Sequence, residues 1–102
     1  MTRGEVWWFE HPAAGRRPAC VLTRPEAISG IRRVLVTFAT TTLRDLPTEV
    51  ALDEEDGMPQ PCVLSLDNVR TVSKAMLVER ITTLSPARMH EVCRALAVAT
   101  AC

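Results

Sequence analysis

Short apolar segments separated by turn residues constrain the fold of this chain more than any other feature of its sequence. The segments are rich in β-branched residues, and Gly, Pro, Asn or Asp interrupts the chain between them, which is typical of a small barrel or sandwich. We predict strands over residues 5–9, 19–23, 33–39, 48–52, 62–66 and 80–84, and a short extended piece over 69–72. Single helical turns are predicted over residues 25–28 and 73–77.

The end of the chain has a different pattern. Ser85 can cap a helix, and Pro86 suits the first helical position. The apolar residues that follow recur at helical spacing: Met89, Val92, Cys93 and Leu96. We therefore predict an α+β fold, in which a small β-barrel of five to seven strands carries one C-terminal α-helix on or beside the sheet.

The length and charge of the chain limit its organisation and its partners. A chain of 102 residues is expected to form a single domain, residues 1–102, with a core of its own. Twelve basic and twelve acidic residues cancel, which argues against binding nucleic acid by bulk electrostatic attraction. Residues 1–50 carry seven Arg and five acidic residues, so any nucleic-acid surface is expected to be local and small.

The four cysteines are far apart and form no pair at metal-ligand spacing. We expect no metal site and no cofactor, and we expect Cys20 and Cys93 to be small core residues of a protein with reduced thiols. No apolar stretch is long enough to span a membrane, and the first ten residues do not form a signal peptide. A cytoplasmic protein with no membrane partner is the expectation.

The segment Arg16-Arg17-Pro18 joins positive charge to the start of an apolar strand. Pro18 has no N–H for a sheet ladder, so we expect it at the first residue of a strand, directly before the apolar segment 19–23. This placement would hold Arg17 at a rigid sheet edge, where its guanidinium can bind a phosphate through two parallel hydrogen bonds. The alternative is an ordinary exposed arginine beside a strand.

Four motifs in order resemble the MazF/PemK/Kid-type toxins. They are Arg3-Gly4-Glu5-Val6-Trp7, the segment from Arg17 to Leu22, Thr40-Thr41-Thr42, and Asp67-Asn68-Val69-Arg70-Thr71. Each motif alone is weak, but their order and spacing match the family over almost the whole chain. The segment from Pro47 to Leu52 is a fifth point of agreement.

The resemblance implies an SH3-like barrel that forms a homodimer and cuts single-stranded RNA at a short sequence without metal. It also implies a cognate antitoxin as protein partner. The catalytic Arg of the family falls on Arg17 and its Thr on Thr40, with Thr41 as the alternative if the alignment is displaced by one residue. Arg17 would stabilise charge on the phosphorus oxygens, and Thr40 would donate a hydrogen bond to one of them.

Three further residues are possible catalytic or RNA-binding groups. Asp67 matches an acidic position that some members use, but those members carry Arg where this chain has Ser65; the alternative for Asp67-Asn68 is a turn whose side chains bond the backbone. His11 lies near, though not at, the position of a family histidine. It is either a general base or an exposed turn histidine.

The aromatic residues and the fold leave further alternatives open. Strand alternation should send Trp7 and Phe9 to one face of the first strand and Trp8 to the other, where it either stacks on bases or fills a core or interface. The same barrel carries a gyrase-directed toxin in a sister family, and a non-catalytic barrel that binds protein or nucleic acid is a third possibility.

Overall fold

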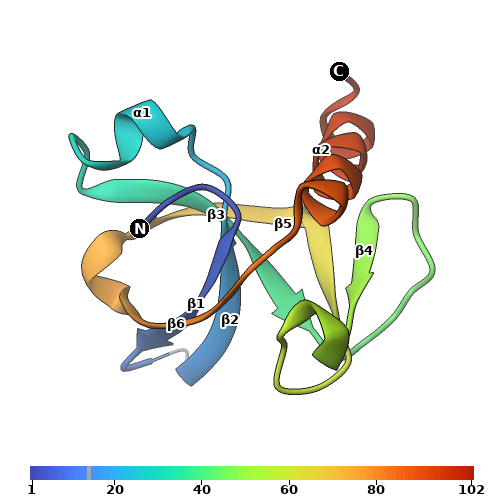
Figure 1. Cartoon of the computed structure of the whole chain (residues 1–102), viewed down its shortest axis with the longest axis horizontal. Coiled ribbons are helices and arrows are strands. Elements are labelled where there is room, and N and C mark those ends of the chain that lie inside the picture. Colours follow the sequence, from blue (N-terminus) through green and yellow to red (C-terminus); the bar gives the residue numbers. More distant parts are fainter. Residues whose placement is uncertain (14) are drawn as a thin grey trace.

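Six antiparallel strands form one curled sheet in the computed structural model, which describes residues 1–13 and 15–102 (Figure 1). The strands are β1 (Glu5–His11), β2 (Gly15–Val21), β3 (Arg33–Thr40), β4 (Glu49–Leu52), β5 (Cys62–Ser73) and β6 (Leu77–Thr83). Their order across the sheet is β4-β5-β3-β2-β1-β6. The predicted α+β barrel with a terminal helix is confirmed.

Four short or terminal helices complete the fold. They are α1 (Pro25–Ile28), the 3-10 turns η1 (Glu54–Asp56) and η2 (Lys74–Met76), and α2 (Pro86–Thr100). Ser85 caps α2 as predicted, because its Oγ accepts the backbone N–H of Arg88 at 3.1 Å. No helix in the described part of the chain is long and apolar enough to cross a membrane.

The strands divide their apolar side chains between two cores on opposite faces of the sheet. On β2, Cys20 packs in the core that α2 covers through Val92, whereas Ala19 and Val21 pack in the other core with Phe9. Trp7 packs against this second core. The predicted separation of Trp7 and Phe9 from Trp8 is confirmed, because Trp8 lines a cavity on the other side.

Of the two cysteines predicted in the core, one is there and one is not. Cys20 is fully buried, and burial raises the pKa of its thiol to about 12. Cys93 is exposed, so that prediction is wrong. The buried stripe of α2 is centred on Val92 and Ala95, and Cys93 lies one position outside it, beside the guanidinium of Arg3 at 3.0 Å.

Strand β5 is a single long strand rather than the two predicted pieces, 62–66 and 69–72. It pairs with β3 in two stretches, and the register changes between Thr37↔Val69 and Ala39↔Leu64. Four residues of β5, 65–68, therefore face only Phe38 on β3, which makes a large bulge. The bulge explains why side chains of equal parity, Leu64 and Val72, enter different cores.

Pro18 lies in the middle of β2 and not at its first residue, which corrects the sequence prediction. The strand pairs with β1 on one side as far as Gly15, but its pairing with β3 ends at Ala19↔Phe38. The backbone N–H of Leu22, just after β2, donates to the carbonyl oxygen of Leu35 on β3. The backbone N–H and C=O groups of the even-numbered residues of β2, Pro18 included, therefore point toward β3. Because Pro18 has no N–H to donate, the ladder stops there and the strands separate.

Candidate active site

A cavity of about 370 Å³ opens where β2 and β3 separate. It is lined by residues 16–18, 39–41 and 58–60, together with Trp8 and Cys62. We call it the β2–β3 cavity. Arg17, Thr40 and Thr41, predicted as site residues from distant parts of the sequence, all line it. They meet there because β2 and β3 are sheet neighbours whose ladder ends just short of them.

Arg17 is half-buried and carries its charge without a carboxylate partner. Its guanidinium carbon lies 4.7 Å from the ring centroid of Phe38, which supports the side chain from β3. Among residues 1–13 and 15–102, no carboxylate oxygen lies within 4.0 Å of this guanidinium. Its N–H groups are therefore available to an anion in the cavity.

The neighbouring Arg16 is held in a different way. Its guanidinium lies 4.4 Å from the ring of Trp8, and it forms ion pairs with Glu10 at 3.4 Å and Glu79 at 3.3 Å. All three charged groups are exposed, so these pairs contribute little stability. They do occupy the guanidinium of Arg16, and this distinguishes it from Arg17.

Thr40 is the last residue of β3, where the strand leaves the sheet for the loop before β4. Its Oγ1 accepts the backbone N–H of Thr42 at 3.2 Å, which leaves its own hydroxyl proton free to donate. Farther along the loop, the Glu49 carboxylate accepts the N–H groups of Arg44 at 3.1 Å and Leu46 at 3.0 Å. The segment that follows Thr40 is thus tied back to β4.

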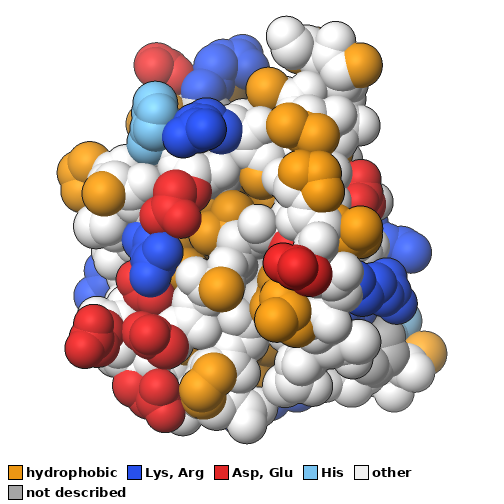
Figure 2. All heavy atoms as spheres, turned by 90° about the vertical axis from the view of Figure 1, so that its right-hand side faces the viewer, with side chains coloured by type: hydrophobic (Ala, Val, Ile, Leu, Met, Phe, Trp, Pro, Cys, Tyr) orange, Lys and Arg blue, Asp and Glu red, His pale blue; other side chains and the backbone are white. Residues whose placement is uncertain are grey.

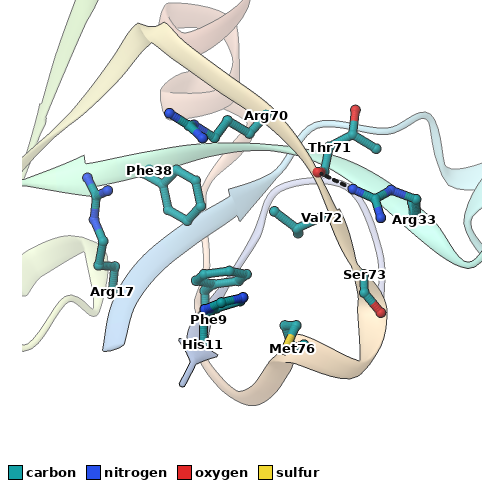
Figure 3. Close-up of a pocket in the computed structure, with 10 residues that line it drawn as sticks. All are labelled: Phe9, His11, Arg17, Arg33, Phe38, Arg70, Thr71, Val72, Ser73 and Met76. Carbon is teal, nitrogen blue, oxygen red and sulfur yellow. Dashed lines mark hydrogen bonds between the residues drawn. The ribbon is translucent and has the colours of Figure 1, made fainter. Parts of the chain in front are cut away.

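A second cavity, of about 550 Å³, is also lined by Arg17 (Figure 3). Residues 70–73 line it, together with Phe9, His11, Arg17, Arg33, Phe38 and Met76. We call it the arginine cavity. Because Arg17 lines both cavities, they form neighbouring parts of one region.

His11 lies at the arginine cavity and not at the β2–β3 cavity. It is the last residue of β1, is exposed, and stacks on Phe9 with 6.4 Å between ring centroids. Its Nδ1 accepts the backbone N–H of Ala13 at 3.0 Å, which leaves Nε2 to face other partners. His11 therefore shares a cavity with Arg17 but not with Thr40.

Asp67 and Ser65 lie in the β5 bulge and are not brought together with Arg17. The Asp67 carboxylate accepts the hydroxyl of Thr48 at 2.5 Å, and the Ser65 carbonyl accepts that of Thr37 at 2.6 Å. The turn considered as the alternative for Asp67-Asn68 is wrong, since both residues belong to β5. Their hydrogen bonds join the bulge to β3 and to the residue before β4.

The thiol of Cys62 also lines the β2–β3 cavity. Burial raises its pKa, and the negative charge of Asp56 raises it further. The group is therefore a neutral thiol at pH 7 rather than a nucleophilic thiolate. In the described residues, no cluster of His, Cys, Asp or Glu has the arrangement of a metal site.

Comparison with known proteins identifies the family. The family model described as the PemK-like, MazF-like toxin of type II toxin-antitoxin systems matches residues 2–100. This chain belongs to that family. It is 48% identical over 101 residues to the "Probable endoribonuclease MazF5" of Mycobacterium tuberculosis, covering 98% of this chain and 93% of that protein. It is 42% identical over 103 residues to the "Probable endoribonuclease MazF2" of the same species, with both chains fully covered.

Solved structures of MazF toxins share the fold. The Mycobacterium tuberculosis toxin MazF-mt6 superimposes with a TM-score of 0.88 at 30% identity, covering 95% of this chain and 96% of that one. An endoribonuclease from mycobacterial species, solved with its cognate antitoxin, gives a TM-score of 0.89 at 27% identity, covering 99% and 95%. The resemblance inferred from the sequence motifs is thus confirmed over nearly the whole length of this MazF-family toxin.

The sequence did not point to several other polar residues that line the two cavities of the toxin. Arg33 and Arg70 line the arginine cavity, and Gln60 lines the β2–β3 cavity. Arg70 lies two residues before the buried Val72 on β5, so strand alternation places both on the same face once the strand is known. That Arg33 lies near it depends on the pairing of β3 with β5, which a single sequence does not encode locally.

Proposed function

We propose that this toxin is a sequence-specific endoribonuclease that cleaves single-stranded RNA without a metal ion and thereby inhibits translation and growth. The observation that carries the proposal is the meeting of Arg17 and Thr40 in one cavity. Its relatives named as endoribonucleases support the same activity. In the reaction, the ribose 2′-oxygen attacks the adjacent phosphorus and the bond from phosphorus to the 5′-oxygen breaks. One proton leaves the 2′-hydroxyl and one reaches the departing 5′-oxygen.

Arg17 is the group that stabilises charge on the phosphoryl oxygens. The charge on these oxygens grows as the 2′-oxygen adds, and an unpaired guanidinium placed beforehand against Phe38 interacts with it more strongly in the transition state than in the substrate. The guanidinium stays protonated throughout, so Arg17 acts as a hydrogen-bond donor and not as a general base.

Thr40 donates its hydroxyl to a non-bridging oxygen. The N–H of Thr42 occupies one lone pair of that hydroxyl and orients it, while its proton remains free. Thr41 lines the same cavity and is the alternative donor if the family register is displaced by one residue.

His11, Asp67 and Ser65 have secondary places in this proposal. His11 is the candidate proton carrier, because Nε2 is the ring nitrogen that Ala13 leaves free and the ring lies in the cavity next to Arg17. Asp67 and Ser65 lie apart from both cavities and are assigned to RNA contact or to the support of the bulge.

The biological setting is part of the same proposal. We propose that the toxin acts in the cytoplasm as a homodimer and is neutralised by a cognate antitoxin. A mycobacterial endoribonuclease with the same fold has been solved in complex with its antitoxin, which supports this assignment.

A cleavage assay in EDTA tests the proposal. The folded protein is incubated with a long single-stranded RNA, and the ends of the products are sequenced. We expect cuts at a short recurring sequence, with cyclic phosphate or phosphate on the 3′ ends. RNA left intact would refute the ribonuclease proposal, and a gyrase-directed toxin would then be tested by supercoiling of plasmid DNA.

A further inference from the structure

Three arginines from three different strands converge on the arginine cavity. Arg17 comes from β2, Arg33 from the start of β3 and Arg70 from the second half of β5 (Figure 3). Among residues 1–13 and 15–102, none of the three has a carboxylate oxygen within 4.0 Å, and no acidic side chain lines the cavity. A chain of zero net charge thus has three uncompensated positive charges around one cavity.

Contacts with neutral groups hold two of these guanidiniums in place. Arg33 Nη2 donates to the carbonyl oxygen of Thr71 at 3.1 Å, and Arg17 lies over the ring of Phe38. Arg70 stands opposite Val36 and has the same parity as Val72, so its side chain projects from the face that bears the cavity. Neither neutral contact cancels a charge, which leaves the arginines ready to bind an anion.

The lower part of the cavity is apolar and aromatic. Phe9 and Phe38 meet edge to face with 5.2 Å between centroids, and Val72 and Met76 continue this surface. A volume of about 550 Å³ lies in the usual range for small-ligand pockets, roughly 300–1,000 Å³. The aromatic rings of the cavity can stack on the base of a nucleotide, and the guanidiniums at its edge can bind the phosphate.

We propose that the arginine cavity binds the RNA nucleotide next to the one that is cut, with Arg33 and Arg70 holding its phosphate. This inference rests on the proposed ribonuclease function. Arg17 lines both cavities, so RNA bound across it places the scissile phosphate beside Thr40 and the neighbouring nucleotide in the arginine cavity. Arg33 and Arg70 are binding residues and take no part in the chemical step.

Salt-dependent binding tests the proposal. The probe is a single-stranded RNA oligonucleotide that contains the mapped cleavage site, with 2′-deoxyribose at the scissile nucleotide so that it is not cut. Binding is measured from 50 to 300 mM NaCl for the wild type, Arg33→Gln, Arg70→Gln and the control Arg94→Gln. Arg94 is exposed on α2 and lines neither cavity.

We expect Arg33→Gln and Arg70→Gln each to weaken binding about tenfold at the lowest salt. Each should also reduce the slope of log Kd against log salt by about 0.7, the value for one lost phosphate contact on a single strand. Arg94→Gln should leave both quantities unchanged. A neutral methylphosphonate at the linkage held in the arginine cavity should weaken wild-type binding, and it should weaken the binding of Arg70→Gln by less, because only Arg33 still contacts the phosphate there.

Two results would overturn the inference. One is a salt slope for Arg33→Gln and Arg70→Gln equal to that of Arg94→Gln; the other is an altered oligomeric state in size-exclusion chromatography with an unchanged slope, which would assign the arginines to a protein interface. Cleavage of the all-ribose oligonucleotide by the wild type in EDTA is measured alongside. If no cleavage site can be mapped, the same binding series is run on an unmodified single-stranded RNA; the expected slopes on that probe would keep the nucleotide-binding site although the ribonuclease proposal fails.

Discussion

Two regions of the toxin are built around an arginine, and they use it in opposite ways. At the corner where η1 meets α2, Arg88 Nε lies 2.9 Å from Asp56 Oδ1 and its Nη1 lies 3.0 Å from Glu91 Oε2. In the region of the two cavities, Arg17 has only an aromatic ring beside it and no carboxylate among the described residues. The face that carries α2 and β4 accordingly shows acidic side chains beside basic ones (Figure 2).

The difference separates an arginine that joins elements of the fold from one whose donors are available to a ligand. Hydrogen bonds with Asp56 and Glu91 raise the pKa of Arg88; conversely, although burial raises the pKa of Asp56, the bond from Arg88 brings it below its usual value. The Nε and Nη1 of Arg88 are thereby occupied by carboxylates, whereas no carboxylate among the described residues occupies the donors of Arg17. A net charge of zero conceals this division, because it counts both kinds equally.

The largest expected effect is on catalysis. Arg17→Ala should lower the rate of RNA cleavage by about two orders of magnitude or more, as expected for the loss of one donor to transition-state charge. The free energy of unfolding should fall by less than about 1 kcal/mol, because the described residues offer Arg17 no ion pair and only the contact with the Phe38 ring is lost. Single-turnover cleavage and urea unfolding measure the two quantities. Near-full activity would show that Arg17 is not catalytic.

A substitution at the η1–α2 corner should lower the free energy of unfolding. Gly57 has φ +90°, and a Cβ atom there would lie 2.3 Å from Thr82 Oγ1, which donates to the Asp56 carbonyl. Gly57→Ala should therefore lower the free energy of unfolding by about 2–3 kcal/mol. Gly30→Ala is the matched control, since no added contact closer than 3.9 Å arises there. Urea unfolding decides, and equal stability of the two variants would contradict the expected strain.

A smaller catalytic effect is expected at the end of β3. Thr40→Ala should reduce cleavage about tenfold through the loss of one neutral donor, whereas Thr40→Ser keeps the hydroxyl and should stay near wild type. Thr41→Ala is measured in the same single-turnover assay. A larger loss for Thr41→Ala than for Thr40→Ala would show that the family register is displaced by one residue.

The smallest effect is a pH-dependent difference in stability. The pKa of Asp56 is lowered in the folded protein, so its charge favours folding above the ordinary Asp value of 3.8 and this contribution disappears as the pH falls through the folded value. The free energy of unfolding of the wild type should exceed that of Asp56→Asn by about 1 kcal/mol at pH 6, and the difference should vanish under strongly acidic conditions. Denaturant unfolding across pH tests this. A difference independent of pH would show that the carboxylate charge is not responsible.

Local patterns in the sequence predicted much of the fold. Alternation placed Trp7 and Phe9 on one face of β1, and the Ser85-Pro86 pair located the start of α2. Both signals act between residues close in the chain, where side-chain direction follows directly from backbone period. Cys93 was placed wrongly because the edge of a helical stripe is decided by the packing partner, here the core that surrounds Val92.

Features that depend on strand pairing were not predictable in this way. The β5 bulge appears only when β5 is matched to β3, since four residues then face Phe38. Likewise, Arg33 and Arg70 are far apart in sequence and line one cavity because β3 and β5 pair. The proximity of Arg17 and Thr40 was expected from the order of the family motifs. Its physical basis is that β2 and β3 are neighbours in the sheet, and the end of their ladder leaves a cavity between the two residues.

The missing hydrogen of Pro18 has a consequence for how this toxin trades stability against activity. Any other residue at that position would bring a backbone N–H donor to the edge of β3. The hydrogen-bonded pairing of β2 with β3 could then continue past Ala19 and Phe38. The added hydrogen bonds would stabilise the folded state, but they would draw the two strands together and close the space between Arg17 and Thr40. A proline in the middle of a strand, which usually weakens a sheet, thus keeps β2 and β3 apart at this point and leaves the space between them open to the proposed RNA strand.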